Sequence, residues 1–488
     1  MSSLPPSPPP SGGLTAGGAE YPAGPPEQWP AWSPLPAPPG PGDPWAAPAP
    51  GPGPSGKGPA LVVIGVVIAL VLVVVAGVIL TNDDPDDLAS GSTTTIDLDD
   101  PPPSTSPLPT MPTMPSIPDL GPDTDPEALA RPLEEVLPEL IAFVETQRGH
   151  RFTTAPVVQA VPEDEFLAAL EATTDEAEIA QLRRDSVAEQ ALGLITPGTD
   201  LAEISRELAA AGVVGFYEPE TAELLVRGDS ITPFVQTVIV HELTHALDDQ
   251  TFDLQRLDAM VEQPDETAVG FVTLVEGTAK WVETAFREQL SPEELAAVEA
   301  EELQFGLEQG PDLLDIPLPF LIESQVPYTV GLQMVTALTE VGGVASLDAA
   351  FADPPVTSEQ VLDPDAYEAR EPSVAVPAPE ADGPVVDEGD FGALDLFLLG
   401  VAADPMSAGP ALASGLIEAP EGFGGGSYVS WGSAAQACVR VTLAGEGESG
   451  AAAIDEITSS WRSAFGGAQV GTAPGPGGTT LITLFRCA

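Results

Sequence analysis

The sequence has few basic residues and is strongly acidic. Its 488 residues include 15 Lys and Arg against 75 Asp and Glu, which gives a formal net charge of -60, and its only lysines are Lys57 and Lys280. Proteins that bind nucleic acid or anionic lipid need basic side chains to displace counterions from phosphates. We therefore expect no nucleic-acid partner, and we attribute the acidity to solubility in a salty exterior rather than to attraction of basic substrates.

Cysteine and histidine are also scarce. The chain has three histidines and two cysteines, and both cysteines, Cys438 and Cys487, lie near the C-terminus in segments that read as strands. They form either a disulfide or two buried thiols. Because the predicted topology places them outside the cell, we favour the disulfide, which would close a loop of about 50 residues.

The first 127 residues are predicted to lie outside the folded domain. Residues 1–59 are rich in Pro, Gly, Ala and Ser. They predict a disordered tail, chiefly a solvated spacer, although such a tail can also be a ligand for aromatic-lined grooves. Residues 60–80 are apolar and uncharged, and as a helix they would extend about 30 Å, which predicts a transmembrane helix. Residues 81–127 are acidic, then rich in Ser, Thr and Pro, and predict an extended stalk.

The charges that flank residues 60–80 predict the orientation of the chain. Lys57 precedes the apolar run, four aspartates follow it, and the next basic residue is Arg131. Lys and Arg favour the cytoplasmic side of a membrane. We therefore predict a single-pass cell-membrane protein with a cytoplasmic N-terminus and an extracellular C-terminal domain.

The remaining residues predict an α+β fold. Apolar residues recur at helical spacing through most of residues 128–420, whereas residues 213–228 read as a β-hairpin around a Glu-Pro-Glu-Thr turn. Residues 353–390 are predicted to be irregular. Residues 421–488 alternate strand, helix and strand, so we expect a small C-terminal α+β subdomain after a mainly helical domain at 128–420.

The helices near the candidate site have recognisable boundaries. Thr232 is predicted to cap a helix that Pro233 opens, and the apolar first half of this helix predicts burial. A further helix is expected over residues 266–290. Residues 318–343 are expected to be helical with an interruption near Pro327.

The motif HELTHALDDQ, residues 241–250, carries the chemistry of the chain. His241 and His245 are one helical turn apart, so both imidazoles can reach one ion while Glu242 points beside it. Two imidazoles and a third protein ligand would leave zinc one position for water. Zinc lowers the pKa of such a water to about 7, and Glu242 would take its proton as general base. The alternative is a pair of core histidines bonded to the backbone.

The third ligand must come from outside the motif. The remaining histidine, His150, lies in a polar context far upstream, so we do not expect a third histidine ligand. Glu276 is the best candidate, because it lies in an apolar helical run beside Gly277, where a divalent cation would offset the cost of a buried carboxylate. The alternative for Glu276 is the edge of an amphipathic helix, and Glu283 and Glu266 are the alternative ligands.

These residues resemble a known family. HELTHALDDQTFDL followed by LVEGTA is similar to bacterial zinc metallopeptidases of the gluzincin type, whose site is thermolysin-like. The likeness extends to QRGHRF, GFYEPET, VPYTVG, PPVTSEQVLDPDAY and the closing cysteine strand, from about residue 130 to the end. It implies a mainly helical zincin-like domain that acts on a peptide or protein. It also implies His241, His245 and Glu276 as zinc ligands, with Glu242 as general base.

The resemblance also suggests roles around the ligands. Asp249 is expected either to support a ligand or to cap the end of the motif helix. The strand ELLVRG, residues 223–228, corresponds to the edge strand on which zincins bind the substrate backbone. Tyr328 is our choice for stabilising the oxyanion, and its alternative is a role as a core tyrosine.

Three positions depart from the family pattern. Thermolysin-like sites carry an acid four residues after the glutamate ligand, where this chain has Lys280, so the first histidine must be supported from elsewhere. Behind the ligands, Thr278 replaces an acid, and Asp363 replaces a histidine, with Tyr367 nearby as a substitute. These departures favour an alternative function, a zinc-binding pseudoenzyme acting as an extracellular binding or scaffolding domain. A structural anchor with an incidental motif is a third reading, but Glu242 favours the enzyme.

Overall fold

The computed structural model describes residues 125–174, 176–261, 266–313, 316–405, 417–433 and 435–488. All of them belong to the second of the chain's two units, Lys57–Ala488. The predicted tail, the predicted transmembrane helix and nearly all of the predicted stalk lie outside the described residues.

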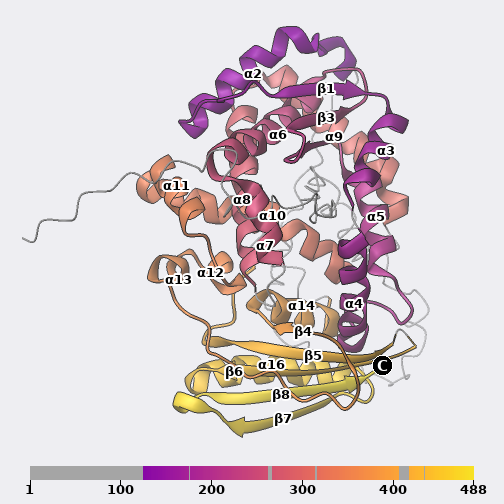
Figure 1. The fold of residues 1–488 in the computed structure, drawn as a ribbon, viewed down its shortest axis with the longest axis vertical. Helices are drawn as coiled ribbons and strands as arrows, with labels where there is room; N and C mark the ends of the chain where they lie inside the picture. Colours follow the sequence, from indigo (N-terminus) through magenta and orange to yellow (C-terminus); the bar gives the residue numbers. More distant parts are fainter. Residues whose placement is uncertain (1–124, 175, 262–265, 314–315, 406–416, 434) are drawn as a thin grey trace, which may run out of the picture. The chain divides into compact units, whose positions relative to one another are not determined.

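The described residues form an α+β fold in which helices predominate (Figure 1), as the sequence predicts. The helices are α2 (Leu133–Arg148), α3 (Glu163–Thr173), α4 (Glu176–Leu192), α5 (Leu201–Gly212), α6 (Pro233–Phe252), α7 (Leu257–Val261), α8 (Thr267–Arg287), α9 (Pro292–Leu313), α10 (Leu318–Gly342), α11 (Val344–Ala352), α12 (Ser358–Leu362), α13 (Pro364–Ala369), α14 (Ala393–Ala403) and α16 (Gly447–Ala464). The strands are β1 (Val157–Val161), β2 (Gly215–Glu218), β3 (Glu223–Arg227), β4 (Val385–Asp390), β5 (Phe423–Ser433), β6 (Gln436–Gly445), β7 (Gln469–Pro474) and β8 (Thr480–Cys487).

The strands form two sheets. In the smaller sheet, of order β1-β3-β2, β1 runs parallel and β2 antiparallel to β3. The larger sheet has the order β4-β5-β6-β8-β7 and is antiparallel throughout. The hairpin predicted at residues 213–228 is confirmed as β2 and β3, with Gly215 opposite Val226.

The order of the smaller sheet corrects the expected substrate strand. ELLVRG forms β3, which lies between β1 and β2, because residues 157–161 pair with it in parallel. A strand with two partners has no free edge to offer a peptide. The edge strand against the motif helix α6 is β2. Gly215 allows this close contact, since a Cβ there would lie 2.6 Å from Val238 Cγ1.

Helices cover one face of the larger sheet. α4 contacts β5 and β6, and α16 contacts β6 and β8 (Figure 1). The two helices are joined by Trp461 on α16, which is fully buried and donates a hydrogen bond to the carbonyl oxygen of Leu192 on α4. On β6 and β8, Cys438 and Cys487 lie directly opposite each other and form a disulfide, which confirms that prediction.

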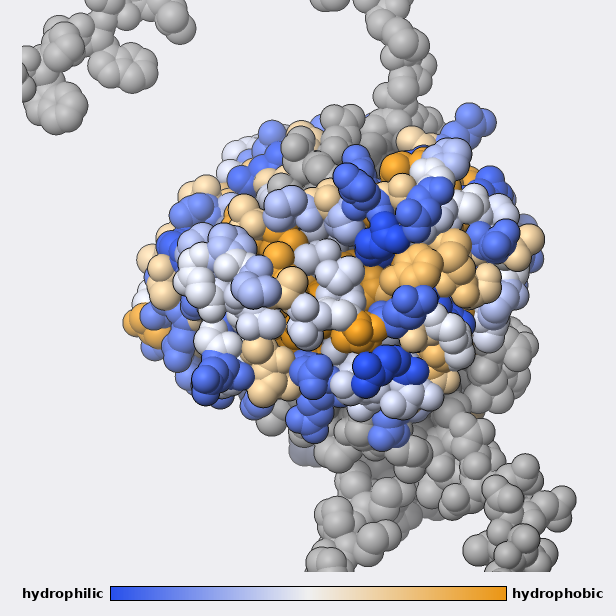
Figure 2. Space-filling view, turned by 90° about the horizontal axis from the view of Figure 1, so that it is seen from below, coloured by the Kyte–Doolittle hydropathy of each residue, from blue (hydrophilic) through white to orange (hydrophobic). Residues whose placement is uncertain are grey.

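The free edge of the larger sheet is exposed. β7 is its last strand, and most of its residues are exposed. Seen from below the orientation of Figure 1, the surface mixes hydrophilic residues with smaller hydrophobic areas (Figure 2). The hydrophobic areas visible in this view are small and separated by hydrophilic residues.

The two hydrophobic cores nearest the candidate site contain most of the buried apolar residues described. The first joins α8, α10 and α14 to the larger sheet and includes Phe271, Leu396 and Ile482. It continues across residue 420, where the sequence predicts the start of a subdomain. The second surrounds α6 and joins it to α2 and the smaller sheet, with Val238 fully buried.

Two glycines let α8 and α10 cross with their backbones in contact. A Cβ on Gly277 would lie 2.3 Å from the carbonyl oxygen of Gly331, and a Cβ on Gly331 would lie 2.5 Å from the carbonyl oxygen of Thr273. No larger side chain fits at either position without moving the helices. Since Tyr328 is one turn before Gly331 and Glu276 is next to Gly277, the crossing sets these two side chains beside each other.

Helix starts were predicted better than helix continuity. The side chain of Thr232 caps α6 and Pro233 is its first residue, as predicted. The expected interruption near Pro327 is wrong, because α10 continues through it. Packing of α10 against α8 compensates for the backbone hydrogen bond that proline cannot make. Residues 353–390, predicted to be irregular, contain the short helices α12 and α13 and the strand β4.

Within the described ranges, no single helix is both long and apolar enough to span a membrane. α10 and α11 reach the required length and hydropathy only when they are counted together, and a bend of 118° separates them.

Replacing Gly331 with alanine tests the helix crossing. The added methyl group would push α8 and α10 apart, so we expect Gly331→Ala to lower the free energy of unfolding by about 1–3 kcal/mol, measured by chemical denaturation of the full chain. Gly400→Ala on α14 is the matched control, because its Cβ would meet only Ile457 Cγ2 at 3.7 Å. Its stability should be unchanged or higher, since alanine is the better helix former. Equal losses in both variants would contradict the crossing.

Candidate metal centre

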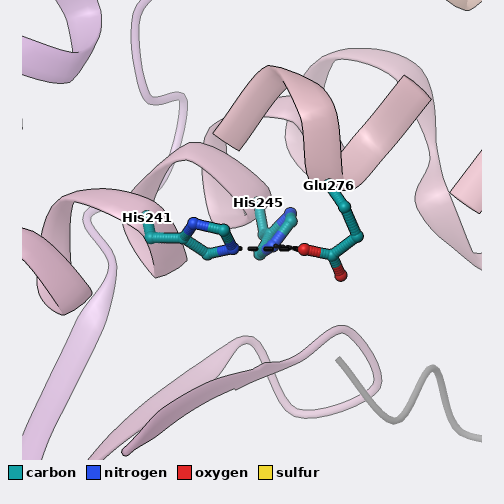
Figure 3. Close-up of side chains that lie close together, drawn as sticks. All are labelled: His241, His245 and Glu276. Atoms are coloured by element: carbon teal, nitrogen blue, oxygen red, sulfur yellow. Dashed lines mark hydrogen bonds and ion pairs between the residues drawn. The ribbon is translucent and has the colours of Figure 1, made fainter. Parts of the chain in front are cut away.

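Two helices bring three ligand groups together (Figure 3). His241 and His245 project from α6 and Glu276 from α8, and one ligand atom of each lies within 4.8 Å of the other two. Glu276 Oε2 is 3.1 Å from His241 Nε2 and 3.4 Å from His245 Nε2. All three side chains are buried. The structure thus brings together the three residues that the sequence analysis proposes as ligands.

The local sequence explains how α6 presents its histidines inside the protein. Every residue from Pro233 to Asp248 is buried. The apolar first half of α6 fills the second core, while Gly215 lets the helix lie close to β2. In a site this deeply buried, charges interact strongly and a cation would be held by protein groups.

The ligand carboxylate is ionised despite its burial. Burial alone would raise the pKa of Glu276, but the charge of His245 and the contacts with both histidines lower it to about 2. Burial lowers the pKa of His241, and its contacts with Glu276 and Glu283 outweigh this effect and raise it. Glu276 is therefore available as an anionic ligand at neutral pH.

Two buried groups at the site lack hydrogen-bond partners among the described residues. One is the carboxylate of Glu242, in which neither oxygen has a partner, and the other is the imidazole of His245, in which Nε2 has none. Burial raises the pKa of Glu242 to about 8, although the charge of His241 opposes the rise. The backbone N–H of Tyr217 on β2 lowers this pKa, because it favours the charged carboxylate. It does not form a hydrogen bond with either carboxylate oxygen. These orphaned atoms fit a metal ion at His245 and a water molecule at Glu242.

Glu283 supports His241 from the side opposite Glu276. Glu283 Oε2 lies 3.3 Å from His241 Nδ1, and Lys280 Nζ donates to Glu283 Oε1 at 2.7 Å. Burial would raise the pKa of Glu283, but Lys280 and His241 lower it to about 2. The sequence analysis proposes Glu283 only as an alternative ligand. The structure places Glu283 beside His241 instead, where Lys280 holds its other carboxylate oxygen.

The hydrogen bonds of Asp249 and Thr278 go to residues other than His241, His245 and Glu276. Asp249 accepts from the hydroxyl of Tyr217 at 2.8 Å and from the backbone N–H of Leu254 at 3.0 Å. The Asp249 side chain therefore connects the last turn of α6 to β2 and to the segment that follows the helix. Thr278 donates to the carbonyl oxygen of Leu274 inside α8, so its expected place behind the ligands is not supported by a contact.

Three further residues considered from the sequence serve the fold elsewhere. Glu266 lies at the start of α8 and outside the ligand group. Asp363 caps α13 by accepting from the backbone N–H of Asp365. The hydroxyl of Tyr367 donates to the carbonyl oxygen of Asp353 at 2.7 Å. Asp363 is thus a helix cap, and the hydroxyl of Tyr367 is engaged away from the ligand group.

Tyr328 is brought to the ligand group by the crossing of α8 and α10. Its ring centroid lies 6.1 Å from that of His241, and its hydroxyl lies near the carboxylate of Glu276. Burial, reinforced by the charges of Glu276 and Glu242, raises the pKa of Tyr328 well above its ordinary value. The hydroxyl therefore keeps its proton and can donate it in a hydrogen bond.

Sequence reasoning missed a buried ion pair that fixes the end of α6. Arg148 is fully buried at the end of α2, and its Nη2 lies 2.8 Å from Oδ1 of Asp248, three residues after His245. Two cation–π contacts enclose the same guanidinium. A signal was present, because Arg148 continues a stripe of buried residues spaced by four along α2, after Val136, Leu140 and Val144.

Comparison with protein-family models, with curated proteins and with solved structures finds no match to the chain. The resemblance to gluzincins therefore stays a prediction that rests on the residues themselves. The observations that bear on function are the buried ligand group, the orphaned carboxylate beside it and the supporting acid behind His241.

Glu283→Gln tests the support of His241. Glutamine keeps the size of the side chain but removes the charge beside Nδ1, so we expect zinc affinity to fall about 10–100-fold, measured on the full chain by competition with a chelating dye. Thr278→Val on the same helix is the control and should keep the wild-type affinity, because its hydroxyl bonds only within α8. Circular dichroism would establish that both variants fold. Unchanged zinc affinity in Glu283→Gln would contradict the role given to Glu283.

Proposed function

We propose that the protein is a zinc metallopeptidase that hydrolyses peptide bonds with Glu242 as general base. The observation that carries the proposal is the buried convergence of His241, His245 and Glu276, with the orphaned carboxylate of Glu242 beside it. A site that only binds zinc does not need a buried base next to its ligands.

The residues of the chain suit the steps of peptide hydrolysis. Zinc, when bound by His241, His245 and Glu276, would supply Lewis-acid chemistry. Glu242 would accept a proton from the attacking water and return it to the leaving amine. The neutral hydroxyl of Tyr328 would donate a hydrogen bond to the developing oxyanion.

A peptide backbone would lie along β2. This strand is at the edge of the smaller sheet, and the amide of its residue Tyr217 acts on Glu242. Backbone pairing at such an edge holds a substrate regardless of its side chains. We therefore assign to β2 the role that the sequence assigned to residues 223–228.

We further propose that this domain lies outside the cell, anchored by residues 60–80 and held off the membrane by the stalk at 81–127. The support comes from the uncharged apolar run and its flanking charges. The disulfide between Cys438 and Cys487 also supports an exterior location, because disulfides persist in oxidising compartments.

A zinc-binding pseudoenzyme is the second candidate function. It is favoured by the use of Asp363 as a helix cap, since the family pattern has a histidine there. Tyr328 would then have to stabilise the oxyanion without a histidine to assist it. Such a protein would keep the metal and bind an extracellular partner without hydrolysing it.

Two substitutions separate these functions. We expect the wild-type full chain to hold about one zinc and to cleave quenched-fluorescent peptides. Glu276→Ala should lose zinc together with hydrolysis. Glu242→Gln should keep zinc and lose about 10²–10⁴-fold in rate, because only the proton acceptor is removed. Zinc content would be measured by mass spectrometry and rates on a broad peptide library.

The outcomes point in different directions. A wild type that holds zinc and cleaves no peptide would favour the pseudoenzyme. A wild type that stays metal-free in the presence of zinc would contradict both functions.

A further inference from the structure

A cleft connects the ligand Glu276 to a group of acidic side chains. Its first part, of about 410 Å³, is lined by Glu276, by Tyr328 and by apolar residues of α8 and α10. Its second part, of about 380 Å³, lies among α4, α10 and α14. The two parts share lining residues, among them Val269, Phe320 and Leu394, so they are continuous.

Carboxylates from five elements line the far end of the cleft, which we call the acidic end. They are Asp185, Glu189, Glu266, Glu323, Asp390 and Asp395. No lysine, arginine or histidine of the described residues lines this part. Arg184 acts on Asp185.

Two carboxyl groups of the acidic end, those of Glu189 and Glu323, lack a partner in the part of the chain that the structure describes. Glu323 lines both parts of the cleft, and neither Glu323 nor Glu189 has a hydrogen-bond or ion-pair partner among the described residues. Burial, reinforced by the charges of Asp395 and Asp185, raises the pKa of Glu323 to about 8. Burial also raises the pKa of Glu189 well above its ordinary value. Enclosed carboxylates without partners are costly, and a cation that entered the cleft would offset that cost.

The spacing of the carboxylates excludes a simple metal site at the acidic end. Within the described ranges, His241, His245 and Glu276 are the one group whose three ligand atoms lie within 4.8 Å of one another. A lysine or arginine side chain fits better, because its N–H donors can reach carboxylates that are further apart. Its aliphatic stem also suits the apolar walls at Val269 and Phe320.

We propose that this cleft is the substrate channel and that its acidic end binds a lysine or arginine side chain of a peptide substrate. The inference rests on the proposed peptidase function, because Glu276 and Tyr328 tie the cleft to the reaction. The acidic end thus has a role of its own, whereas we attribute the general acidity of the chain to solubility.

Binding of paired peptides to the zinc-loaded full chain tests the inference without depending on turnover. The protein would carry Glu242→Gln, and the probes would be acetylated hexapeptide amides of Ala and Leu with one arginine at each position in turn. The matched probes carry citrulline, which has nearly the same shape and no charge. We expect arginine at one position to bind about tenfold more tightly than citrulline, measured by calorimetry.

Substitutions assign that preference to the acidic end. Adding Glu189→Gln and Glu323→Gln should remove most of it. Adding Glu340→Gln, an exposed acid on the same helix as Glu323, should leave it intact. A preference that survives the double substitution, or no preference at any position, would overturn the inference.

Hydrolysis by the wild type distinguishes this failure from failure of the proposed function. Arginine selectivity in binding without cleavage of any peptide would leave the cationic site standing and remove the peptidase. Cleavage of arginine and citrulline peptides at equal rates, with equal binding, would leave the peptidase standing and remove the cationic site.

Thermal stability provides an independent check on the charge of the acidic end. A carboxyl group whose pKa rises from about 4.5 to about 8 on folding stabilises the fold at low pH and loses that contribution as pH rises toward 8. Glu323→Gln should therefore melt at a higher temperature than the wild type at pH 8 and at a similar temperature at pH 5. A lower melting temperature at pH 8 would show that Glu323 has a partner and would contradict the inference.

Discussion

The rest of the site depends on the interaction of the buried Glu276 carboxylate with two histidines, His241 and His245. A carboxylate that deep in the protein is stable only if cationic or hydrogen-bonding groups face it. α6 supplies His241 and His245, and the glycine crossing of α8 with α10 supplies Tyr328. Glu283 and Lys280 then fix His241 from behind. The large buried surfaces of α6 and α8 keep these groups in place.

The three residues of the candidate metal centre could be identified from the sequence because each carries a local signal. The four-residue spacing of His241 and His245 fixes a shared helix face, and Glu276 is conspicuous as an acid in an apolar helix. The supporting acid could not be predicted in the same way. Lys280 breaks the family pattern, and only the structure shows that Glu283 takes over the contact with His241.

Long-range pairing explains most of the errors. The sequence of ELLVRG indicates a strand but not its neighbours, and the parallel partner β1 lies more than 60 residues earlier. Pro327 would interrupt an isolated helix, yet packing against α8 keeps α10 continuous. The acidic end of the cleft was hidden for the same reason. Its carboxylates come from distant segments, and in a chain with 75 acidic residues no single one of them stands out.

The central claim is that His241, His245 and Glu276 together hold one zinc ion, and X-ray absorption at the zinc edge of the purified full chain tests it most directly. The account predicts four nitrogen or oxygen donors at about 2.0–2.2 Å, with the multiple scattering of two imidazoles and no sulfur. A zinc shell without imidazole scattering, or one with sulfur donors, would contradict it.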